Sequence, residues 1–120
     1  MNPANLLLRF LLELTALAGF AVCAWQTTSG RWRALFALTV VLCVIALWGI
    51  FAVPDDPSRS GSAPVPIPGA VRLVLELTIL FGGAFAWHQA GYSVVGIVAG
   101  ALITLHYAFS TDRIFWLLQQ

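Results

Sequence analysis

The sequence predicts an all-α fold: a polytopic membrane protein with four transmembrane helices in an up-down-up-down bundle. Hydrophobic residues make up 60% of its 120 residues, charged residues make up 9%, and the mean hydropathy is +0.90. Soluble domains carry about a quarter charged residues, so this composition is typical of a chain that lies in a lipid bilayer. Four apolar stretches reach the roughly 20 residues that a helix needs to cross the hydrocarbon core. We therefore expect a single membrane domain over residues 1–120.

Two short polar turns and one longer loop separate the expected spans. The spans cover residues 6–26, 33–53, 69–88 and 92–110. The second span is the most sharply defined, because no charged residue lies between Ala34 and Val53. Glycine in both short connections is typical of turns between antiparallel helices. Trp25, Trp32 and Arg33 flank the first turn and match the amphipathic anchors of a membrane interface.

Two segments lie outside the expected spans, a loop at residues 54–68 and a C-terminal segment at residues 111–120. The loop holds five of the six prolines. Such a composition cannot bury a core, so we expect an extended or disordered linker, with a Pro-rich docking peptide as the alternative. The C-terminal segment follows Ser110 and Thr111, which can cap a helix. It is expected to form a short interfacial helix or the last turn of the fourth span.

The two cysteines are expected to be buried free thiols. Cys23 and Cys43 lie in different spans, at depths that differ by about 10 Å when each residue rises about 1.5 Å. A disulfide needs Cα atoms within about 7 Å of each other. The stretch around Cys23 resembles a small-residue cleavage site, but Glu13 would fall inside the hydrophobic region of a signal peptide, so we expect the first span to be retained.

A seven-residue stretch that occurs twice carries the most informative polar residues. Residues 9–15 (RFLLELT) return as residues 72–78 (RLVLELT), with five of the seven identical at an offset of 63. Each copy places an Arg four residues before a Glu, so both charges lie on one face of a helix. The two pairs are Arg9 with Glu13 and Arg72 with Glu76. A charge at the centre of a span costs about 2.5–3.5 kcal/mol on insertion scales, and its retention indicates a functional site.

The two pairs are expected to lie in one polar layer of the bundle. Spans one and three enter from the same side, so both glutamates lie about 10 Å deep in the same leaflet. His106, near the far end of the fourth span, comes to a comparable depth. The candidate residues for binding or proton relay are Arg9, Glu13, Arg72, Glu76 and His106.

Three hypotheses for this layer stay open. In the first, each Arg–Glu pair closes on itself, and the arginine extends to the lipid headgroups. In the second, the two carboxylates lie close together, share protons and form a relay or a cation-coordination point. In the third, the layer holds a homodimer or a partner helix. His106 alone does not decide between them, because a single histidine in a membrane helix is most often hydrogen-bonded packing.

The sequence lacks the motifs of common enzymes, so we expect no enzymatic activity, no catalytic residue, no metal and no cofactor. No HExxH or CxxC motif occurs, and His88 and His106 are expected on opposite sides of the membrane. Six basic residues, all Arg, are too few for a nucleic-acid surface. The expected partners are the lipid bilayer and a second copy of the chain, because Gly96 and Gly100 present a small-residue face. The sequence identifies no partner protein.

The distribution of arginine bears on orientation. Four spans place both termini and the 54–68 loop on one side of the membrane. The arginines on that side are Arg9, Arg59, Arg72 and Arg113, and those on the other are Arg31 and Arg33. The positive-inside rule therefore favours cytoplasmic termini. The counts become equal when the two arginines of the repeated motif are treated as neutralised by their glutamates.

Three stretches also carry a family resemblance. Residues 5–14 read NLLLRFLLEL, residues 48–54 read WGIFAVP, and residues 72–77 read RLVLEL before Phe81 and Gly82. These stretches resemble the opening, the end of the second span and the third span of the YrdB-like small bacterial membrane proteins, a family of unknown function. The resemblance covers residues 5–109, and the family pattern is expected to end before Asp112. It implies a four-helix protein of the bacterial inner membrane and supplies no substrate.

These observations lead to two functional hypotheses. The first is a non-enzymatic membrane protein whose polar layer supports the passage or sensing of protons or of a small polar solute. Glu13 and Glu76 are then the exchangeable acids, and His106 is a relay. Arg9 and Arg72 are their electrostatic partners. The alternative is a structural or assembly subunit, in which the Arg–Glu pairs only lock helices together.

Overall fold

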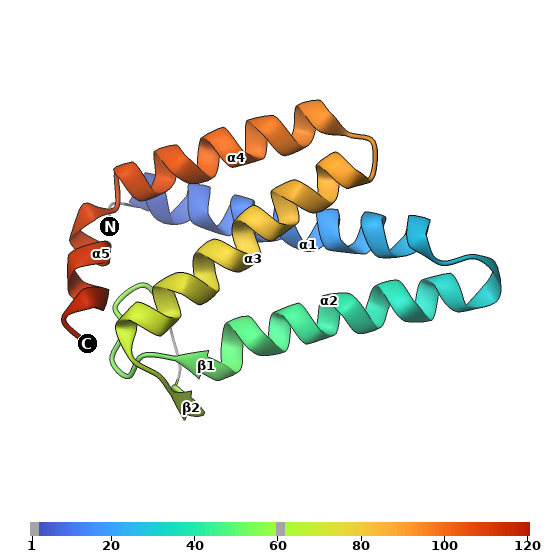
Figure 1. The fold of residues 1–120 in the computed structure, drawn as a ribbon. Helices are drawn as coiled ribbons and strands as arrows, with labels where there is room; N and C mark the ends of the chain where they lie inside the picture. The colour runs from blue at the N-terminus through green and yellow to red at the C-terminus, as the bar shows by residue number, and fades with distance from the viewer. Residues whose placement is uncertain (1–2, 60–61) are drawn as a thin grey trace.

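The computed structural model describes residues 3–59 and 62–120, and it is helical apart from one pair of very short strands (Figure 1). The elements are α1 (Pro3–Thr27), a 3-10 turn (Gly30–Trp32), α2 (Arg33–Ile50), β1 (Phe51–Ala52), β2 (Val65–Pro66), α3 (Gly69–Gln89), α4 (Ser93–Ala108) and α5 (Thr111–Leu118). The predicted all-α class is confirmed. The start of α1, the two strands and α5 gather at one end of the molecule (Figure 1).

Several helices are long and apolar enough to cross a membrane. Three pass on their own, namely α1, the stretch Gly30–Ile50 and α3. The fourth candidate is α4 together with α5, and these two helices are bent by 71° at the break between them. The described chain therefore has three candidate spans, or four if the bent pair counts as one. The second helix ends at Ile50, three residues before the predicted boundary, because Phe51 and Ala52 enter a strand.

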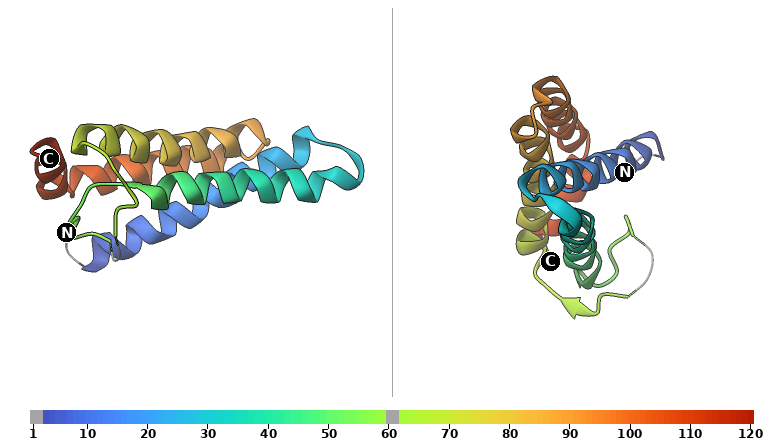
Figure 2. Two further views of the ribbon diagram at one scale, coloured as in Figure 1. Left: turned by 90° about the horizontal axis from the view of Figure 1, so that it is seen from below. Right: turned by 90° about the vertical axis from the view of Figure 1, so that its right-hand side faces the viewer.

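The centre of the molecule is the packing of α3 against α1 and α4, while α2 lies on the outside (Figures 1 and 2). A buried apolar cluster joins these three helices. Its members are Leu12, Ala16, Leu80, Ala84, Ala99, Ile103 and Tyr107. By contrast, no residue of α2 is buried. Its apolar surface is therefore left for lipid or another apolar partner.

Small residues set how closely the helices approach. A Cβ added at Gly83 on α3 would lie 2.5 Å from the Cα of Ala16 on α1, so only glycine fits there. In the same way, a Cβ added at Gly96 on α4 would lie 2.6 Å from the carbonyl oxygen of Ala84 on α3. Gly96 thus packs inside the chain, and the small-residue face is left open only at Gly100. Self-association stays a prediction.

The loop that was expected to be extended or disordered is partly built into the fold. β1 and β2 pair in parallel, with Phe51 opposite Val65, and the amide of Ile67 donates to the carbonyl of Ala52 at 2.9 Å. Asp56 is only 5% exposed. Nothing in the sequence indicates a buried residue in this loop, and the burial of Asp56 follows from its ion pair with an arginine of α5. Residues 60 and 61 of the loop lie outside the described part of the chain.

The C-terminal segment forms a helix of its own across the end of α3 (Figures 1 and 2). Leu117 is fully buried, and its backbone packs directly on Gly69 at the start of α3, where no Cβ would fit. Of the two predicted alternatives, a separate helix is the one observed.

Both cysteines are free, as predicted. Their predicted burial is wrong for Cys43, which is exposed, while Cys23 is partly buried. The reason is that Cys43 belongs to α2, which packs against the rest of the chain on one side only.

Candidate functional site

A fully buried carboxylate, Glu76 on α3, lies at the centre of the polar residues. Its Oε1 accepts hydrogen bonds from Arg9 Nη2 at 2.8 Å, from Arg72 Nε at 3.0 Å and from Arg113 Nη2. Its Oε2 accepts one from the Tyr107 hydroxyl at 2.9 Å. The four donors come from α1, α3, α4 and α5, so a single side chain joins four helices.

Arg113 also binds a second carboxylate. Its Nη1 and Nη2 donate to the two oxygens of Asp56 at 2.7 and 3.0 Å, in the bidentate geometry of a strong ion pair. The amide and hydroxyl of Ser58 donate to the same carboxylate at 2.9 and 2.8 Å. Burial alone would raise the pKa of Asp56, but the hydrogen bonds from Arg113 and Ser58 lower it to about 2. Asp56 is therefore ionised at neutral pH and ties the 54–59 segment to α5.

The end of α2 is held by the same group of residues. Arg72 Nη1 donates to the carbonyl oxygens of Trp48 and Phe51, both at 2.6 Å. The last carbonyl groups of a helix have no donor within the helix, so Arg72 satisfies them here. The guanidinium carbons of Arg9 and Arg72 lie 5.3 and 4.8 Å from the centre of the Trp48 ring. Two cation–π contacts on one indole add to this connection.

Glu13 lies at the edge of the group. It accepts one hydrogen bond, from Arg9 Nε at 3.2 Å, and its side chain is 26% exposed. The other five ionised side chains are 6% exposed or less. We name the six side chains the arginine–carboxylate cluster: Arg9, Glu13, Asp56, Arg72, Glu76 and Arg113. Three guanidinium charges against three carboxylate charges leave a net charge of zero.

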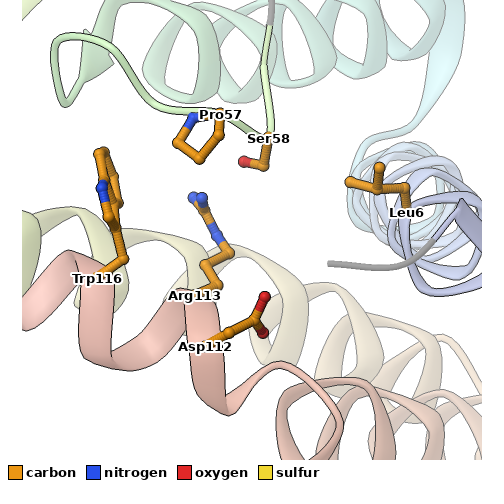
Figure 3. Close-up of a pocket in the computed structure, with 6 residues that line it drawn as sticks. All are labelled: Leu6, Pro57, Ser58, Asp112, Arg113 and Trp116. Carbon is orange, nitrogen blue, oxygen red and sulfur yellow. The ribbon is translucent and has the colours of Figure 1, made fainter.

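The cluster borders a pocket of about 270 Å³ at the same end of the molecule (Figure 3). Leu6, Pro57, Ser58, Asp112, Arg113 and Trp116 line it. Arg113 points across this pocket toward Pro57 and Ser58 (Figure 3). Within residues 3–59 and 62–120, no three His, Cys, Asp or Glu side chains are grouped so that they could hold a metal ion.

Comparison with known proteins identifies the family. Residues 7–104 match the family described as "Protein of unknown function (DUF2568)". The chain belongs to this family. It is 42% identical over 120 residues to "Uncharacterized protein YrdB" of Bacillus subtilis (strain 168), in an alignment that covers 100% of this chain and 98% of the relative. No solved structure matches the chain.

The predicted resemblance to YrdB-like proteins is thus confirmed. The DUF2568 model ends at residue 104, while the alignment with the Bacillus relative continues to the C-terminus. Arg9, Glu13, Arg72 and Glu76 lie inside the matched region. Arg113 lies beyond it, so the cluster of this DUF2568 protein combines the region that defines the family with the segment that follows.

Four of the five predicted site residues lie together in the cluster. Both predicted i to i+4 pairs form, Arg9 with Glu13 at 3.2 Å and Arg72 with Glu76 at 3.0 Å. The pairs do not close on themselves, however, because Arg9 also bonds Glu76. The two arginines are 5% and 1% exposed, so neither reaches the headgroup surface as the first hypothesis supposed.

His106 lies outside the hydrogen-bonded cluster. It is fully buried, and its Nδ1 lies 2.8 Å from Asn5 Oδ1. Its ring meets the Tyr107 ring edge-on, with the centres 4.9 Å apart. Among the described residues, its Nε2 has no hydrogen-bond partner. His106 is therefore linked to Glu76 through the ring contact with Tyr107, and among the described residues it makes no hydrogen bond to either glutamate.

Sequence reasoning missed four residues that complete the site: Trp48, Asp56, Tyr107 and Arg113. Asp56 and Arg113 are 57 positions apart, and each lies in a segment expected to be outside the bundle. The composition of the expected layer gave no signal for them. Two arginines and two glutamates, each in a predicted pair, gave no reason to seek a third pair. Trp48 was noted only as the first residue of the WGIFAVP stretch at the end of the second span, with no arginine assigned to it.

Proposed function

We propose that this chain is a multi-pass protein of the bacterial inner membrane, in which α1, α2, α3 and α4 form an up-down-up-down bundle of four spans. Tyr92 and Phe109 flank the 16 residues of α4, where aromatic side chains serve as interface anchors. The 71° bend after α4 supports a position for α5 along the membrane surface, since α5 buries one face and exposes the other.

In the proposed orientation both termini are cytoplasmic. The positive-inside rule acts during insertion, before arginines find their partners in the folded protein, and acidic residues contribute little to it. The count of four arginines against two therefore applies, even though three of the four are paired in the final fold.

Within this topology, the arginine–carboxylate cluster is a structural lock that closes one end of the bundle. Of the two functional hypotheses, this one corresponds to the structural or assembly subunit. The observation that carries it is that Glu76 accepts hydrogen bonds from four donors on four helices. A carboxylate held in this way exchanges a proton or binds a cation only after several buried bonds break. Three guanidinium groups already bond Glu76, so its carboxylate has no excess charge that a free cation would balance.

The test compares Glu76→Gln with the wild type in two assays, thermal unfolding in detergent and proton flux in liposomes. The substitution leaves three arginines against two carboxylates, so we expect a marked fall in unfolding temperature and no change in flux. Glu13→Gln is the matched control, because it makes the same change at an acid that is 26% exposed, and its fall in unfolding temperature should be smaller. The structural lock would be refuted if Glu76→Gln unfolds at the same temperature as the wild type and loses a proton flux that the wild type shows.

A second candidate function, the sensing or passage of a small solute, is favoured by one observation. Glu13 accepts a single bond of 3.2 Å, and its side chain is 26% exposed. Of the two predicted exchangeable acids, only Glu13 therefore has a carboxylate within reach of a ligand. This function would depend on Glu13 and on the pocket that it lines, not on Glu76.

A further inference from the structure

A pocket of about 260 Å³ opens between α1 and α2, away from the buried centre of the cluster. Its walls come from α1, the second half of α2 and one residue of α3. The lining residues are Phe10, Glu13, Leu14, Leu17, Val44, Ile45, Trp48, Gly49 and Ile79. Seven of these nine residues have apolar or aromatic side chains, Gly49 has none, and Glu13 is the one ionisable group among them.

Glu13 is poorly satisfied in this pocket by comparison with Glu76. Its Oε1 receives the 3.2 Å bond from Arg9 Nε, while Arg9 makes its shorter bond, 2.8 Å, to Glu76. Within residues 3–59 and 62–120, the hydrogen bond that Glu13 accepts ends on Oε1, which leaves Oε2 without a donor. A carboxylate oxygen that faces hydrocarbon without a donor is costly, because a membrane interior has no water to supply one.

We propose that this pocket binds a lipophilic primary amine in its protonated form. The ammonium group donates to Glu13 Oε2, and the hydrocarbon part lies against Phe10, Leu17 and Ile45. The ammonium supplies the missing donor to Glu13. It also adds a positive charge beside Glu13, because the charge of Arg9 is shared between Glu13 and Glu76. The apolar walls then favour a ligand with a hydrocarbon body over a small hydrophilic amine.

Other occupants fit these observations less well. A lipid acyl chain fills the apolar walls but leaves Glu13 Oε2 without a donor. A quaternary ammonium brings charge but has no N–H to donate. An anion would be repelled by the negative charge of the Glu13 carboxylate. Entry from the lipid side is open, since α2 contributes four of the nine lining residues and none of the residues of α2 is buried.

The test measures binding of radiolabelled dodecylamine to the full-length detergent-solubilised protein, by scintillation proximity on beads. We expect saturable binding to the wild type and at least tenfold weaker binding to Glu13→Gln. Unlabelled dodecylamine should compete at least tenfold better than dodecanol, which has a neutral donor, and than dodecyltrimethylammonium, which has charge and no donor. Leu17→Trp, which fills the pocket and leaves Glu13 in place, should also weaken binding at least tenfold.

Several results would overturn the proposal. They are the absence of saturable binding, unchanged affinity in Glu13→Gln, and equal competition by either analogue. Equal competition by dodecanol would indicate a groove for acyl chains, and equal competition by the quaternary ammonium would indicate recognition of charge alone. If Glu13→Gln fails to fold, Leu17→Trp replaces it as the test, and unchanged dodecylamine binding in that variant would overturn the proposal. The proposal is independent of the lock, because the Glu76→Gln experiment measures unfolding and proton flux rather than amine binding.

Discussion

Arg9 on α1 donates a 2.8 Å hydrogen bond to Glu76 on α3, 67 positions along the chain. This bond connects the two copies of the repeated motif and makes them unequal. The first copy contributes its arginine to the centre of the cluster, while its glutamate is left at the edge, 26% exposed. The second copy contributes the fully buried carboxylate. A repeat in sequence has thus become a donor on one helix and an acceptor on another.

The pair between Asp56 and Arg113 should be strongly coupled. Arg113→Gln leaves the buried Asp56 carboxylate without its guanidinium, and we expect it to lower the free energy of unfolding by roughly 3–5 kcal/mol. Asp56→Asn should cost less, because Arg113 keeps its bond to Glu76. The double variant should cost clearly less than the sum. Equilibrium unfolding in mixed detergent micelles measures all three. Arg31→Gln, at an exposed arginine, serves as the control, with an expected change within about 0.5 kcal/mol. Full additivity would mean that the two residues do not interact.

Acid should weaken the tie between α5 and the 54–59 segment. The pKa of Asp56 falls from an ordinary 3.8 to about 2 in the folded protein. A lowered carboxyl pKa stabilises the fold above the unfolded-state value, and the contribution is lost as the pH falls from about 4 to about 2. We expect a loss of about 1–2 kcal/mol, after allowing for solvent screening at the end of the bundle.

The measurement is the unfolding free energy between about pH 5 and pH 2, compared between the wild type and Asp56→Asn. The variant lacks this titration, so the difference between the two proteins should shrink as the pH falls. A difference that stays constant over the range would contradict the lowered pKa of Asp56.

Close packing of α1 on α3 should make Gly83 intolerant of a side chain. A Cβ there would lie 2.5 Å from the Cα of Ala16, so Gly83→Ala should destabilise the protein by about 1–3 kcal/mol. Gly100→Ala is the matched control on α4, because a Cβ added there meets no atom of the described residues within 4 Å. It should be neutral or stabilise by up to about 1 kcal/mol. Similar melting temperatures for the two variants would refute the close approach.

The proposed orientation predicts which sites a membrane-impermeant maleimide reaches in intact cells. In a Cys23→Ala, Cys43→Ala background, Ser29→Cys lies in the turn after α1, and Gln119→Cys lies just after α5. We expect the first to react in intact cells and the second only after the inner membrane is permeabilised. The reverse pattern would place the termini outside the cytoplasm, and reaction at both sites in intact cells would exclude an even number of spans.

Apolar periodicity and the spacing of the repeated motif were enough to predict the helices and the two local ion pairs. A pair four residues apart on a helix forms wherever the helix forms. Arg9–Glu13 and Arg72–Glu76 are of this kind, and the structure has both. Which pair would lie at the centre could not be predicted, because that depends on how α1 rotates against α3, and the close contact of Gly83 with Ala16 sets this rotation.

The rest of the cluster depends on contacts between segments that have no local pattern. Asp56 lies among prolines, where solvent exposure is the usual outcome, and Arg113 follows Asp112, which offers a nearer partner. Their pairing requires the 71° bend between α4 and α5, which turns Arg113 toward the bundle. Tyr107 lies in an apolar stretch of sequence, and nothing there indicates that its hydroxyl donates to Glu76. Sequence periodicity carries no information on either of these two contacts.

The order of these residues along the chain also has a consequence for biosynthesis. Arg9 and Arg72 precede Glu76, whereas Arg113 follows it by 37 positions. During translation, two of the three guanidinium partners of Glu76 are therefore made before Arg113. A product truncated between α4 and α5 would leave both Glu76 and Asp56 without the Arg113 guanidinium, and its polar end would stay open to quality-control proteases.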